Sequence, residues 1–356
     1  MRVLNLMLGQ GHGGLEQAAI DYAQLLTTIG FDVVTVGHPG GWMRSALPST
    51  QSFVPLRCFG DYDFIAKWRL RRMAKALQPM LIIAHGTRAI RYGAGLSNRA
   101  KIGVLHNTRF KTDLAAMDGF IAVSPKLGDA AAEVYPDKPM AVVPNMVHIG
   151  EPIQRPRFRS PPVIGALGRL HRNKGYDVLF EALASPELAA RPWQCVLGGD
   201  GPERTTLEAE AKRRGISDRV RFIGWVSDRQ AFFNTIDLFV LPSREEPFGI
   251  VLIEAMAAGL PVVATDTDGP SSILHDGQTG LMVPRDNAKA LAGALINALA
   301  SQADMAHMGQ SGFADAKARF SQEDVAALLK SALDRLLPEI KAYSNSAGKP
   351  GARKLV

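Results

Sequence analysis

Two glutamates, Glu246 and Glu254, stand eight residues apart in the stretch SREEPFGIVLIEAMAAGLPVVAT. A carboxylate pair can cleave a glycosidic bond when its carboxyl groups lie about 5–9.5 Å apart. Eight helical steps would separate these two residues by about 12 Å, and an extended loop between them would not shorten that distance. The pair is therefore unsuited to flank one scissile bond, and is better placed to hold two ends of one elongated ligand.

The backbone between the two glutamates can bind the middle of such a ligand. The sequence predicts a helix over residues 249–258, so the amides of Phe248, Gly249, Ile250 and Val251 lie free at its start. Free amides at a helix N-terminus favour a diphosphate, and a carboxylate on each side can accept hydrogen bonds from sugar hydroxyls. This pattern describes a nucleotide-sugar, with its sugar, diphosphate and ribose in a row.

These residues depend on the elements that carry them, and short apolar strands alternate with helical patterns along most of the chain. The alternation predicts parallel sheets covered by helices on both faces, which is the doubly wound α/β class. The expected strands cover residues 3–8, 31–36, 80–84, 102–105, 120–123 and 141–143, and then 163–167, 194–197, 220–223, 238–241, 261–264 and 281–283.

Between these two series lies IGEPIQRPRFRSPP, rich in proline and arginine, which predicts a linker over 151–162. The linker separates an N-terminal Rossmann-like domain, 1–150, from a C-terminal one, 163–321. An amphipathic helix over 322–342 is expected to cross back to the N-terminal domain, and residues 343–356 are expected to form a disordered tail. Because ligands bind beyond the carboxyl ends of parallel strands, the two domains predict a ligand held in the cleft between them.

The loop GQGHGG after the first strand formally satisfies the GxGxxG pattern of dinucleotide sites. That fingerprint also requires an acidic residue after the second strand, where this chain has VGHP. An NAD(P) site is therefore disfavoured. Two alternatives stay open: a purely structural tight turn, or backbone amides around Gly13 and Gly14 that bind a phosphate or a sugar hydroxyl at a helix start.

The net charge of +7 favours anionic partners. Much of the excess lies in KWRLRRMAKAL, from Lys67 to Leu77, which has five basic residues in nine positions and predicts a basic amphipathic helix. Two interpretations stay open: a solvated helix packed by its apolar side, and contact with an anionic membrane surface. Aromatic residues make up only 7% and form no stripe beside these charges, so nucleic acid is disfavoured as a partner.

The two cysteines, Cys58 and Cys195, lie in apolar runs without metal-binding spacing, which predicts buried free thiols in a reducing compartment. No apolar run reaches 18 residues, and the start MRVLNLMLGQ lacks the features of a signal peptide. A cytoplasmic protein is expected. If the basic helix contacts a membrane, the protein is peripheral on the inner face of the cytoplasmic membrane.

The stretch around the two glutamates resembles the E-x7-E region of the retaining GT-B glycosyltransferases of family 4. The resemblance covers about residues 3–340 and is stronger in the second half. It implies two Rossmann-like domains facing across a cleft, and a hexosyltransferase that moves a sugar from a nucleotide-diphosphate-sugar to a glycan or glycolipid in cell-envelope polysaccharide or lipopolysaccharide biosynthesis. Further segments match the family motifs in order: GGLE (13–16), AVSPKL (122–127), VVPNMV (142–147), GRLHRNKG (168–175), GGDGPER (198–204) and HDGQTGLMVP (275–284).

The resemblance also implies roles for single residues in donor binding. Arg169 and Lys174, of the Arg-x4-Lys motif, would neutralise the donor diphosphate. Their positive charges would offset the negative charge that the leaving group develops in the transition state. Glu246 would contact the hydroxyls of the transferred sugar, and Glu254 would bind the ribose. The remaining donor-binding positions are Gly13, Gly14, Gly198, Phe248, Gly249, Ile250 and Val251.

Three residues of the first half complete the implied active site. His106, in IGVLHNT, matches the family histidine near the donor sugar, while His85 and Asn107 are expected to line the acceptor cleft. Retention without a placed protein nucleophile implies departure and attack on the same face, with the leaving phosphate helping to remove the acceptor's proton. Asp266 and Asp268 have the letters of a metal motif but lie in a sugar-nucleotide loop, so neither a metal nor a cofactor is expected.

One position departs from the family pattern, because Ser272 stands where glutamate is usual, which puts the hydrogen bonding of its loop in question. An alternative function from another class is a catalytically silent protein that binds sugar nucleotides on the same fold. The intact set of Arg169, Lys174, Glu246 and Glu254 favours the enzyme.

Overall fold

The computed structural model describes residues 1–97, 99–108, 110, 112–153 and 158–338. The chain divides into two compact units. Unit 1 comprises Met1–Met146 together with the chain from Gln322 onward, and unit 2 comprises Val147–Ser321. The predicted linker over 151–162 is described only in part, and the predicted tail over 343–356 lies outside the described residues.

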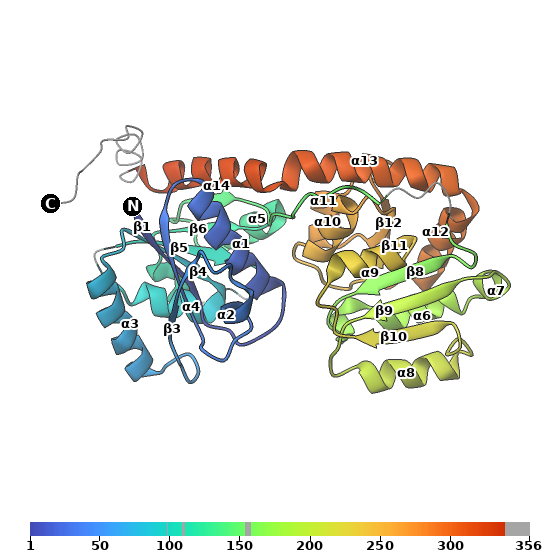
Figure 1. Ribbon diagram of the computed structural model, residues 1–356, viewed down its shortest axis with the longest axis horizontal. Coiled ribbons are helices and arrows are strands. Elements are labelled where there is room, and N and C mark those ends of the chain that lie inside the picture. Colours follow the sequence, from blue (N-terminus) through green and yellow to red (C-terminus); the bar gives the residue numbers. More distant parts are fainter. Residues whose placement is uncertain (98, 109, 111, 154–157, 339–356) are drawn as a thin grey trace. The chain divides into compact units, whose positions relative to one another are not determined.

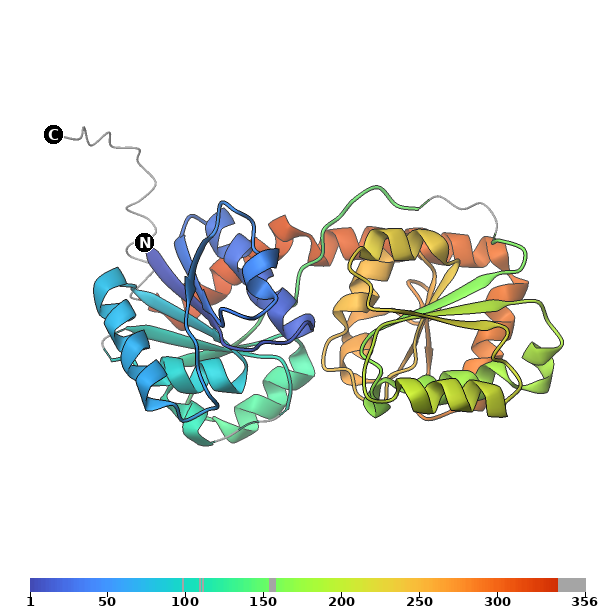
Figure 2. The ribbon, with the colours of Figure 1, turned by 60° about the horizontal axis from the view of Figure 1, so that its bottom comes forward.

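Unit 1, whose β1 and α1 are drawn in blue in Figure 1, is built on a parallel sheet of seven strands in the order β3–β2–β1–β4–β5–β6–β7. Its central strands are buried along their length, as in LIIAH of β4, because helices cover both faces of the sheet (Figure 2). The elements are β1 (Arg2–Met7), α1 (Gly14–Thr28), β2 (Asp32–Gly37), α2 (Met43–Ala46), β3 (Ser52–Pro55), α3 (Phe64–Leu77), β4 (Leu81–His85), α4 (Gly86–Ala94), β5 (Ala100–Leu105), η1 (Thr112–Ala116), β6 (Gly119–Ala122), α5 (Pro125–Val134), β7 (Met140–Val142) and α14 (Gln322–Leu336).

Unit 2 repeats this plan with a parallel sheet of six strands in the order β10–β9–β8–β11–β12–β13. The elements are β8 (Val163–Leu167), η2 (Arg172–Lys174), α6 (Tyr176–Leu183), α7 (Pro186–Ala189), β9 (Gln194–Gly198), α8 (Arg204–Arg213), β10 (Val220–Gly224), α9 (Arg229–Thr235), β11 (Leu238–Leu241), α10 (Ile250–Ala257), β12 (Val262–Thr265), α11 (Asp268–Ile273), β13 (Leu281–Val283), α12 (Ala288–Ala300) and α13 (Gln302–Phe320).

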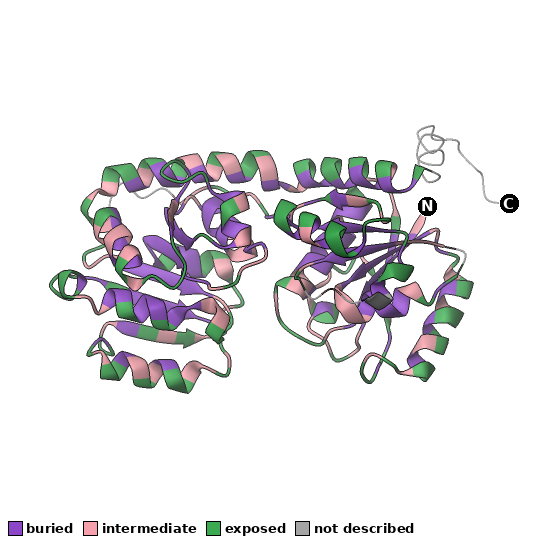
Figure 3. Ribbon diagram, turned by 180° about the vertical axis from the view of Figure 1, so that it is seen from behind, coloured by how far each residue is buried: buried purple, intermediate pink, exposed green. Residues whose placement is uncertain are grey.

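Buried residues gather on the strands and on the helix sides that pack against them (Figure 3). In unit 2, the core joins Phe180 of α6, Trp193 before β9, and Leu197 at the end of β9, all nearly inaccessible to solvent. Burial of such large apolar side chains stabilises each by about 1.5–3 kcal/mol. The strands therefore form a firm base from which the loops at their carboxyl ends project.

The predicted fold class, two doubly wound α/β units, is confirmed by both sheets. Each of the expected strands has a counterpart, with ends that differ by a residue or two. The strand β3, with sequence SFVP, was not predicted. It is a four-residue edge strand without a buried residue, and it ends in Pro55, so no apolar run marks it.

In both sheets the strand order reverses between two neighbouring central strands, β1 and β4 in unit 1 and β8 and β11 in unit 2. Ligands of doubly wound sheets bind beyond the carboxyl ends of the strands at such a switch point. A functional site is therefore expected in the loops that follow these four strands.

Helix α14 belongs to unit 1, although it follows the whole of unit 2 in the chain. It packs against α1 and β7, and Gln322 Nε2 donates to Thr28 Oγ1 at 3.0 Å. The predicted helix over 322–342 is thus seen over Gln322–Leu336, and residues 339–342 lie outside the described part of the chain. Across the described residues, no helix is both long and apolar enough to span a membrane.

Candidate active site

Lys174 and Glu246 form an ion pair at the carboxyl end of the unit 2 sheet, with Lys174 Nζ 2.5 Å from Glu246 Oε2. Lys174 ends η2, which follows β8, and Glu246 lies in the loop after β11. Since β8 and β11 are the two switch-point strands, residues 72 positions apart meet here. The side chains are 22% and 10% exposed, so the pair is largely withdrawn from water while one edge stays accessible.

The two loops that carry this pair are held together through their backbones. The carbonyl oxygen of Asn173 accepts hydrogen bonds from the backbone N–H groups of Arg244 (2.8 Å) and Glu245 (3.2 Å). Gly175, directly after Lys174, has φ +65°, and a Cβ there would lie 2.0 Å from the carbonyl oxygen of Pro242. Only glycine permits both this left-handed conformation and this close approach.

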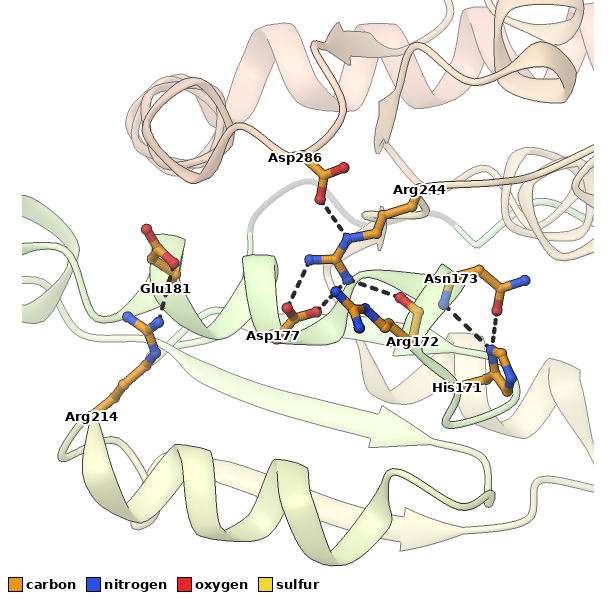
Figure 4. A network of polar contacts seen from close by, with 8 residues as sticks. All are labelled: His171, Arg172, Asn173, Asp177, Glu181, Arg214, Arg244 and Asp286. Atoms are coloured by element: carbon orange, nitrogen blue, oxygen red, sulfur yellow. Dashed lines mark hydrogen bonds and ion pairs between the residues drawn. The ribbon is translucent and has the colours of Figure 1, made fainter.

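Arg244 fastens the same loops through its side chain (Figure 4). Its guanidinium donates to both carboxylate oxygens of Asp177 at 2.7 Å, to Asp286 Oδ1 at 2.5 Å, and to the carbonyl oxygen of Arg172 at 2.8 Å. Bidentate arginine–carboxylate pairs of this kind fix geometry as well as adding energy. Arg244 thus ties the Glu246 loop to the turn that carries Lys174.

Glu254, on α10, has one satisfied and one unsatisfied oxygen. Its Oε1 is paired with Arg229 on α9, while Oε2 is buried without a hydrogen-bond partner among the described residues. Burial raises the pKa of Glu254, and the nearby Arg229 opposes that shift. A buried acceptor without a partner is costly, so Oε2 is a position at which a donor from a ligand would be bound favourably.

The start of α10 presents free backbone amides between the two glutamates. Gly249 is its N-cap with φ +100°, no side chain caps the helix, and Phe248 before it is buried. The start of α11 braces this turn, because Gly269 N donates to the carbonyl oxygen of Glu246 at 2.7 Å. A Cβ on Gly269 would lie 1.9 Å from the carbonyl oxygen of Phe248, so the two backbones touch.

Ser272, the departure from the family pattern, lies in α11 rather than in a loop. Its hydroxyl donates to the carbonyl oxygen of Gly269 at 2.7 Å, and its own carbonyl accepts from Arg319 at 2.8 Å. The short helix that braces the α10 turn is therefore internally bonded with serine in place of glutamate.

Arg169 is exposed directly after β8 and has no ion pair to any described residue. Its position is fixed by neighbouring backbone bonds, in which Gly168 N donates to Gly198 O at 3.0 Å and Leu170 N donates to Asp200 O at 2.9 Å. The two predicted diphosphate cations thus differ: Lys174 is ion-paired with Glu246, while Arg169 has no ion pair to any residue that the structure describes.

In unit 1, the glycine loop encloses a carboxylate of its own chain. Glu16, in the first turn of α1, is buried and turned back toward the loop, so that a Cβ on Gly9 would lie 2.6 Å from its Oε1. Burial raises the pKa of Glu16, while backbone hydrogen bonds, including those from Gly11 and Gly13, oppose the shift. Gly13, predicted to bind the donor, therefore lies beside the carboxylate of Glu16, since a Cβ on Gly13 would lie 3.4 Å from Glu16 Oε2.

His85, the last residue of β4, and His106, directly after β5, lie side by side, with His85 Nδ1 3.3 Å from His106 Nε2. His85 is 1% exposed, and its Nε2 lies 2.9 Å from Asn5 Oδ1 on β1. Burial lowers the pKa of His85 well below its usual range and that of His106 to about 4. His106 is partly accessible and Asn107 is exposed, whereas His85, predicted to line the acceptor cleft, has both ring nitrogens engaged inside the unit.

Four functional candidates were not found from the sequence: Asn5, Glu16, Arg229 and Arg244. Asn5 could have been identified from the sequence, since a polar residue inside the buried strand RVLNLM requires a hydrogen-bond partner. Arg229 and Arg244 meet their partners only through the fold. Within the described parts of both units, no group of three or more His, Cys, Asp or Glu side chains is placed to hold a metal ion.

Two protein-family models match the chain. The model described as "Glycosyl transferases group 1" matches residues 151–315, and that described as "Glycosyltransferase Family 4" matches residues 12–151. Together they cover both units from the glycine loop to α13.

The chain is also similar to curated proteins over nearly its whole length. It is 28% identical to the lipopolysaccharide core biosynthesis glycosyltransferase LpsE of Rhizobium meliloti (strain 1021), over 91% of this chain and 96% of that protein. It is 26% identical to LpsD of the same strain, also a lipopolysaccharide core biosynthesis glycosyltransferase, over 94% of this chain and 98% of that protein.

Among solved structures, Anabaena HepE in complex with UDP-glucose superposes with a TM-score of 0.80 at 22% identity, covering 94% of this chain and 100% of that one. The apo form of the lipopolysaccharide outer core galactosyltransferase WaaB superposes with a TM-score of 0.75 at 18% identity, covering 95% of this chain and 100% of that one. These likenesses establish the GT-B fold.

Proposed function

The chain belongs to the group 1 glycosyltransferases of family 4, and from this premise we propose that it transfers a sugar from a nucleotide-diphosphate-sugar to a glycan or glycolipid acceptor, with retention of anomeric configuration and without a metal ion. Lipopolysaccharide core biosynthesis is the proposed process, because both relatives matched over nearly the whole chain are named for it. The observation that carries the proposal is the unit 2 site, in which Glu246 and Glu254 flank the free amides of α10.

In this proposal each part of the site binds one part of the donor. The amides at the start of α10 and the free cation of Arg169 bind the diphosphate. The buried Oε2 of Glu254 accepts a hydrogen bond from a ribose hydroxyl, which satisfies an oxygen that has no partner in the part of the chain that the structure describes. Glu246 contacts the transferred sugar from the opposite side of the turn, with Lys174 beside it.

The proposed chemistry takes place on one face of the sugar. The bond from the anomeric carbon to the phosphate oxygen breaks, and the acceptor oxygen bonds to the same carbon on the same face. The proton of the acceptor hydroxyl passes to the departing phosphate oxygen, so the products are the glycoside and a nucleoside diphosphate. Arg169 and Lys174 offset the charge that develops on the leaving group, a role for which preorganised cations are suited.

The donor is identified by a thermal-shift screen of UDP-, GDP- and ADP-sugars, because a ligand of the folded state stabilises it by RT ln(1 + [L]/Kd). With the donor in hand, nucleoside diphosphate release is measured on acceptor fractions for the wild type, Lys174→Ala and Glu246→Ala. The proposal requires that both variants lose activity while Glu245→Gln, an exposed neighbour, keeps it. Full activity in both alanine variants contradicts it, and donor binding without turnover on any acceptor favours a silent binding protein.

We further propose that unit 1 docks peripherally on an anionic membrane face through what we term the α3 surface, residues 57–75. Helix α3 packs against the rest of unit 1 through Ala66, Leu70 and Ala74, so the apolar side of the helix that faces the protein is already buried. The apolar groups left outside are instead Phe59, Tyr62, Phe64, Ile65 and Trp68, each between 54% and 81% exposed. Six basic residues accompany them, namely Arg57, Lys67, Arg69, Arg71, Arg72 and Lys75.

Aromatic side chains that enter the headgroup region, joined by cations that attract anionic lipid, give reversible membrane binding. A cavity of about 560 Å³ lies between residues 57–63 and α3, and its charged lining residues are Arg57, Asp61, Asp63 and Arg69, so it has no net excess of positive charge. Co-sedimentation with phosphatidylglycerol vesicles is expected to be lost in the double variant Phe64→Ser/Ile65→Ser and kept in Leu328→Ser, which removes an exposed leucine of α14. Equal binding of both variants, or equal binding to neutral vesicles, contradicts docking by this surface.

A further inference from the structure

Asn5, His85 and His106 form a line of hydrogen-bonding groups across the centre of the unit 1 sheet. Asn5 lies in the middle of β1, His85 ends β4, and His106 follows β5. Asn5 Oδ1 is 2.9 Å from His85 Nε2, and His85 Nδ1 is 3.3 Å from His106 Nε2. Asn5 and His85 are inaccessible to solvent, whereas His106 is partly accessible at the outer end of the line.

The orientation of the Asn5 amide is fixed by its other partners. Asn5 Nδ2 lies 2.7 Å from the carbonyl oxygen of Ala19, which can only accept, so this atom must be the amide nitrogen. The oxygen Oδ1 then faces His85 and can only accept in turn. His85 Nε2 must therefore carry a proton.

The direction of the hydrogen bond between Asn5 and His85 also fixes the direction of the next one, between His85 and His106. In a neutral imidazole one nitrogen donates and the other accepts, so protonation at Nε2 leaves His85 Nδ1 as an acceptor. His106 Nε2, which faces it, must then donate, and His106 Nδ1 keeps its lone pair. Burial keeps both rings neutral, and no carboxylate among the described residues is paired with either ring.

We propose that Asn5 and His85 are positioning residues that hold His106 in the tautomer protonated at Nε2, so that Nδ1 is the hydrogen-bond acceptor that His106 offers to a substrate hydroxyl. The contact with substrate rests on the proposed function, whereas the tautomer chain stands on the geometry of unit 1 alone. It gives His85 a role that a fully buried side chain can fill, in place of direct contact with an acceptor.

The tautomers can be read directly from the full-length protein labelled with ¹⁵N-histidine. Long-range ¹H–¹⁵N spectra at pH 7 distinguish protonated from unprotonated ring nitrogens, and His106→Asn and His85→Gln assign the two rings among the eight histidines. We expect both rings to be protonated at Nε2 and bare at Nδ1. A proton on Nδ1 of His106, or averaged shifts from exchanging tautomers, overturns the proposal.

Variants test whether His85 imposes the state of His106. In His85→Leu the two ¹⁵N shifts of His106 are expected to move toward each other, because the acceptor that held the proton at Nε2 is lost. His85→Gln supplies an amide oxygen as acceptor and is expected to keep the wild-type shifts, and it also serves if the leucine variant fails to fold. Tyr22→Phe is the matched control, since the ring centroid of Tyr22 lies 4.8 Å from that of His85, edge-on, but its hydroxyl has no hydrogen-bond partner among the described residues.

Kinetics separate this proposal from the proposed function. If transferase activity is found, His85→Leu is expected to lower kcat/KM at least tenfold, and His85→Gln to restore most of it. If no donor and acceptor pair gives activity, the spectra still decide the tautomer chain. Unchanged His106 shifts in His85→Leu, or shifts in Tyr22→Phe as large as those in His85→Leu, would show that packing rather than hydrogen bonding sets the ring.

Discussion

The ammonium group of Lys174 lies 2.5 Å from the carboxylate of Glu246, so two residues expected to bind different parts of a donor are ion-paired with each other. Each group is thereby preorganised, since neither must be drawn in from solvent when the donor arrives. The pair also keeps a partly buried cation and anion from being left uncompensated, which would cost several kcal/mol.

Because they act as one unit, Lys174 and Glu246 are expected to be non-additive in catalysis. Lys174→Met and Glu246→Gln should each lower kcat/KM by about 10²–10³, as loss of one preorganised charge typically does. The double variant should lose little more than the worse single variant. Nucleoside diphosphate release measures all three enzymes. Losses that multiply in the double variant would mean that the two residues act independently.

The orphan oxygen of Glu254 predicts a specific loss of nucleotide affinity in Glu254→Gln. Glutamine keeps an oxygen that can accept the hydrogen bond but lacks the charge, and hydrogen bonds to a charged acceptor are about twice as strong as neutral ones, so the Kd for the nucleoside diphosphate should rise by about tenfold. Calorimetric titration measures this Kd. Glu208→Gln, which removes an exposed partner of Arg204 on α8, should bind as the wild type does. If Glu254→Gln bound the nucleoside diphosphate as tightly as the wild type does, Glu254 would not be a ribose-binding residue.

Gly175 and Gly215 provide a matched test of the backbone contact beside Lys174. Their φ angles are +65° and +70°, but a Cβ at Gly175 would lie 2.0 Å from the carbonyl oxygen of Pro242, whereas a Cβ at Gly215 meets nothing within 4 Å. Gly215→Ala should lower the free energy of unfolding only by the cost of holding alanine in the left-handed conformation, about 1 kcal/mol. Gly175→Ala should lower thermal stability far more and abolish activity, because the turn carrying Lys174 must move. Comparable melting temperatures for the two variants would contradict this close contact.

The buried His85 and the partly accessible His106 predict that unit 1 loses stability in acid. The pKa of His106 is lowered from 6.5 to about 4 in the folded state, so between these values the unfolded chain binds more protons and unfolding becomes easier as the pH falls. From pH 7 to pH 5 this amounts to about 2 kcal/mol for His106, and His85 acts in the same direction.

Amide hydrogen exchange in β1, β4 and β5, corrected for intrinsic rates, measures this loss within unit 1. His106→Asn cannot become charged and should flatten the pH dependence, whereas His275→Asn, an exposed histidine of unit 2, should leave it unchanged. A wild type whose protection in these strands is constant from pH 7 to pH 5 would show that the histidines are accessible to protons in the folded state.

The sequence was informative where chemistry and local pattern coincide. Apolar runs located the strands, because a strand buried on both faces must be apolar throughout. The position of Glu246 before a glycine and of Glu254 inside the following helix was also predictable, since Gly249 ends the loop and the helical pattern begins after it. Both features are local in the chain, and the structure retains them.

Features that depend on which loops meet were not predictable. Arg229 reaches Glu254 because α9 and α10 lie near each other in the folded unit, and Arg244 finds Asp286 only because β11, β12 and β13 are neighbours. Glu16 is a different case, because an acidic residue in the first turn is common to many helices. Its spacing from the glycines did not predict that its carboxylate would lie inside the glycine loop. Pairings of this kind follow from topology.

The return of the chain to unit 1 through α14 has a consequence for how the protein is made. Unit 2 is one continuous stretch, Val147–Ser321, whereas the unit 1 core takes α14 from a segment that leaves the ribosome only after all of unit 2. Domains fold largely as units during synthesis, so unit 2 can be complete while the surfaces of α1 and β7 that α14 covers are still bare. The first unit to be translated is therefore the last to be finished.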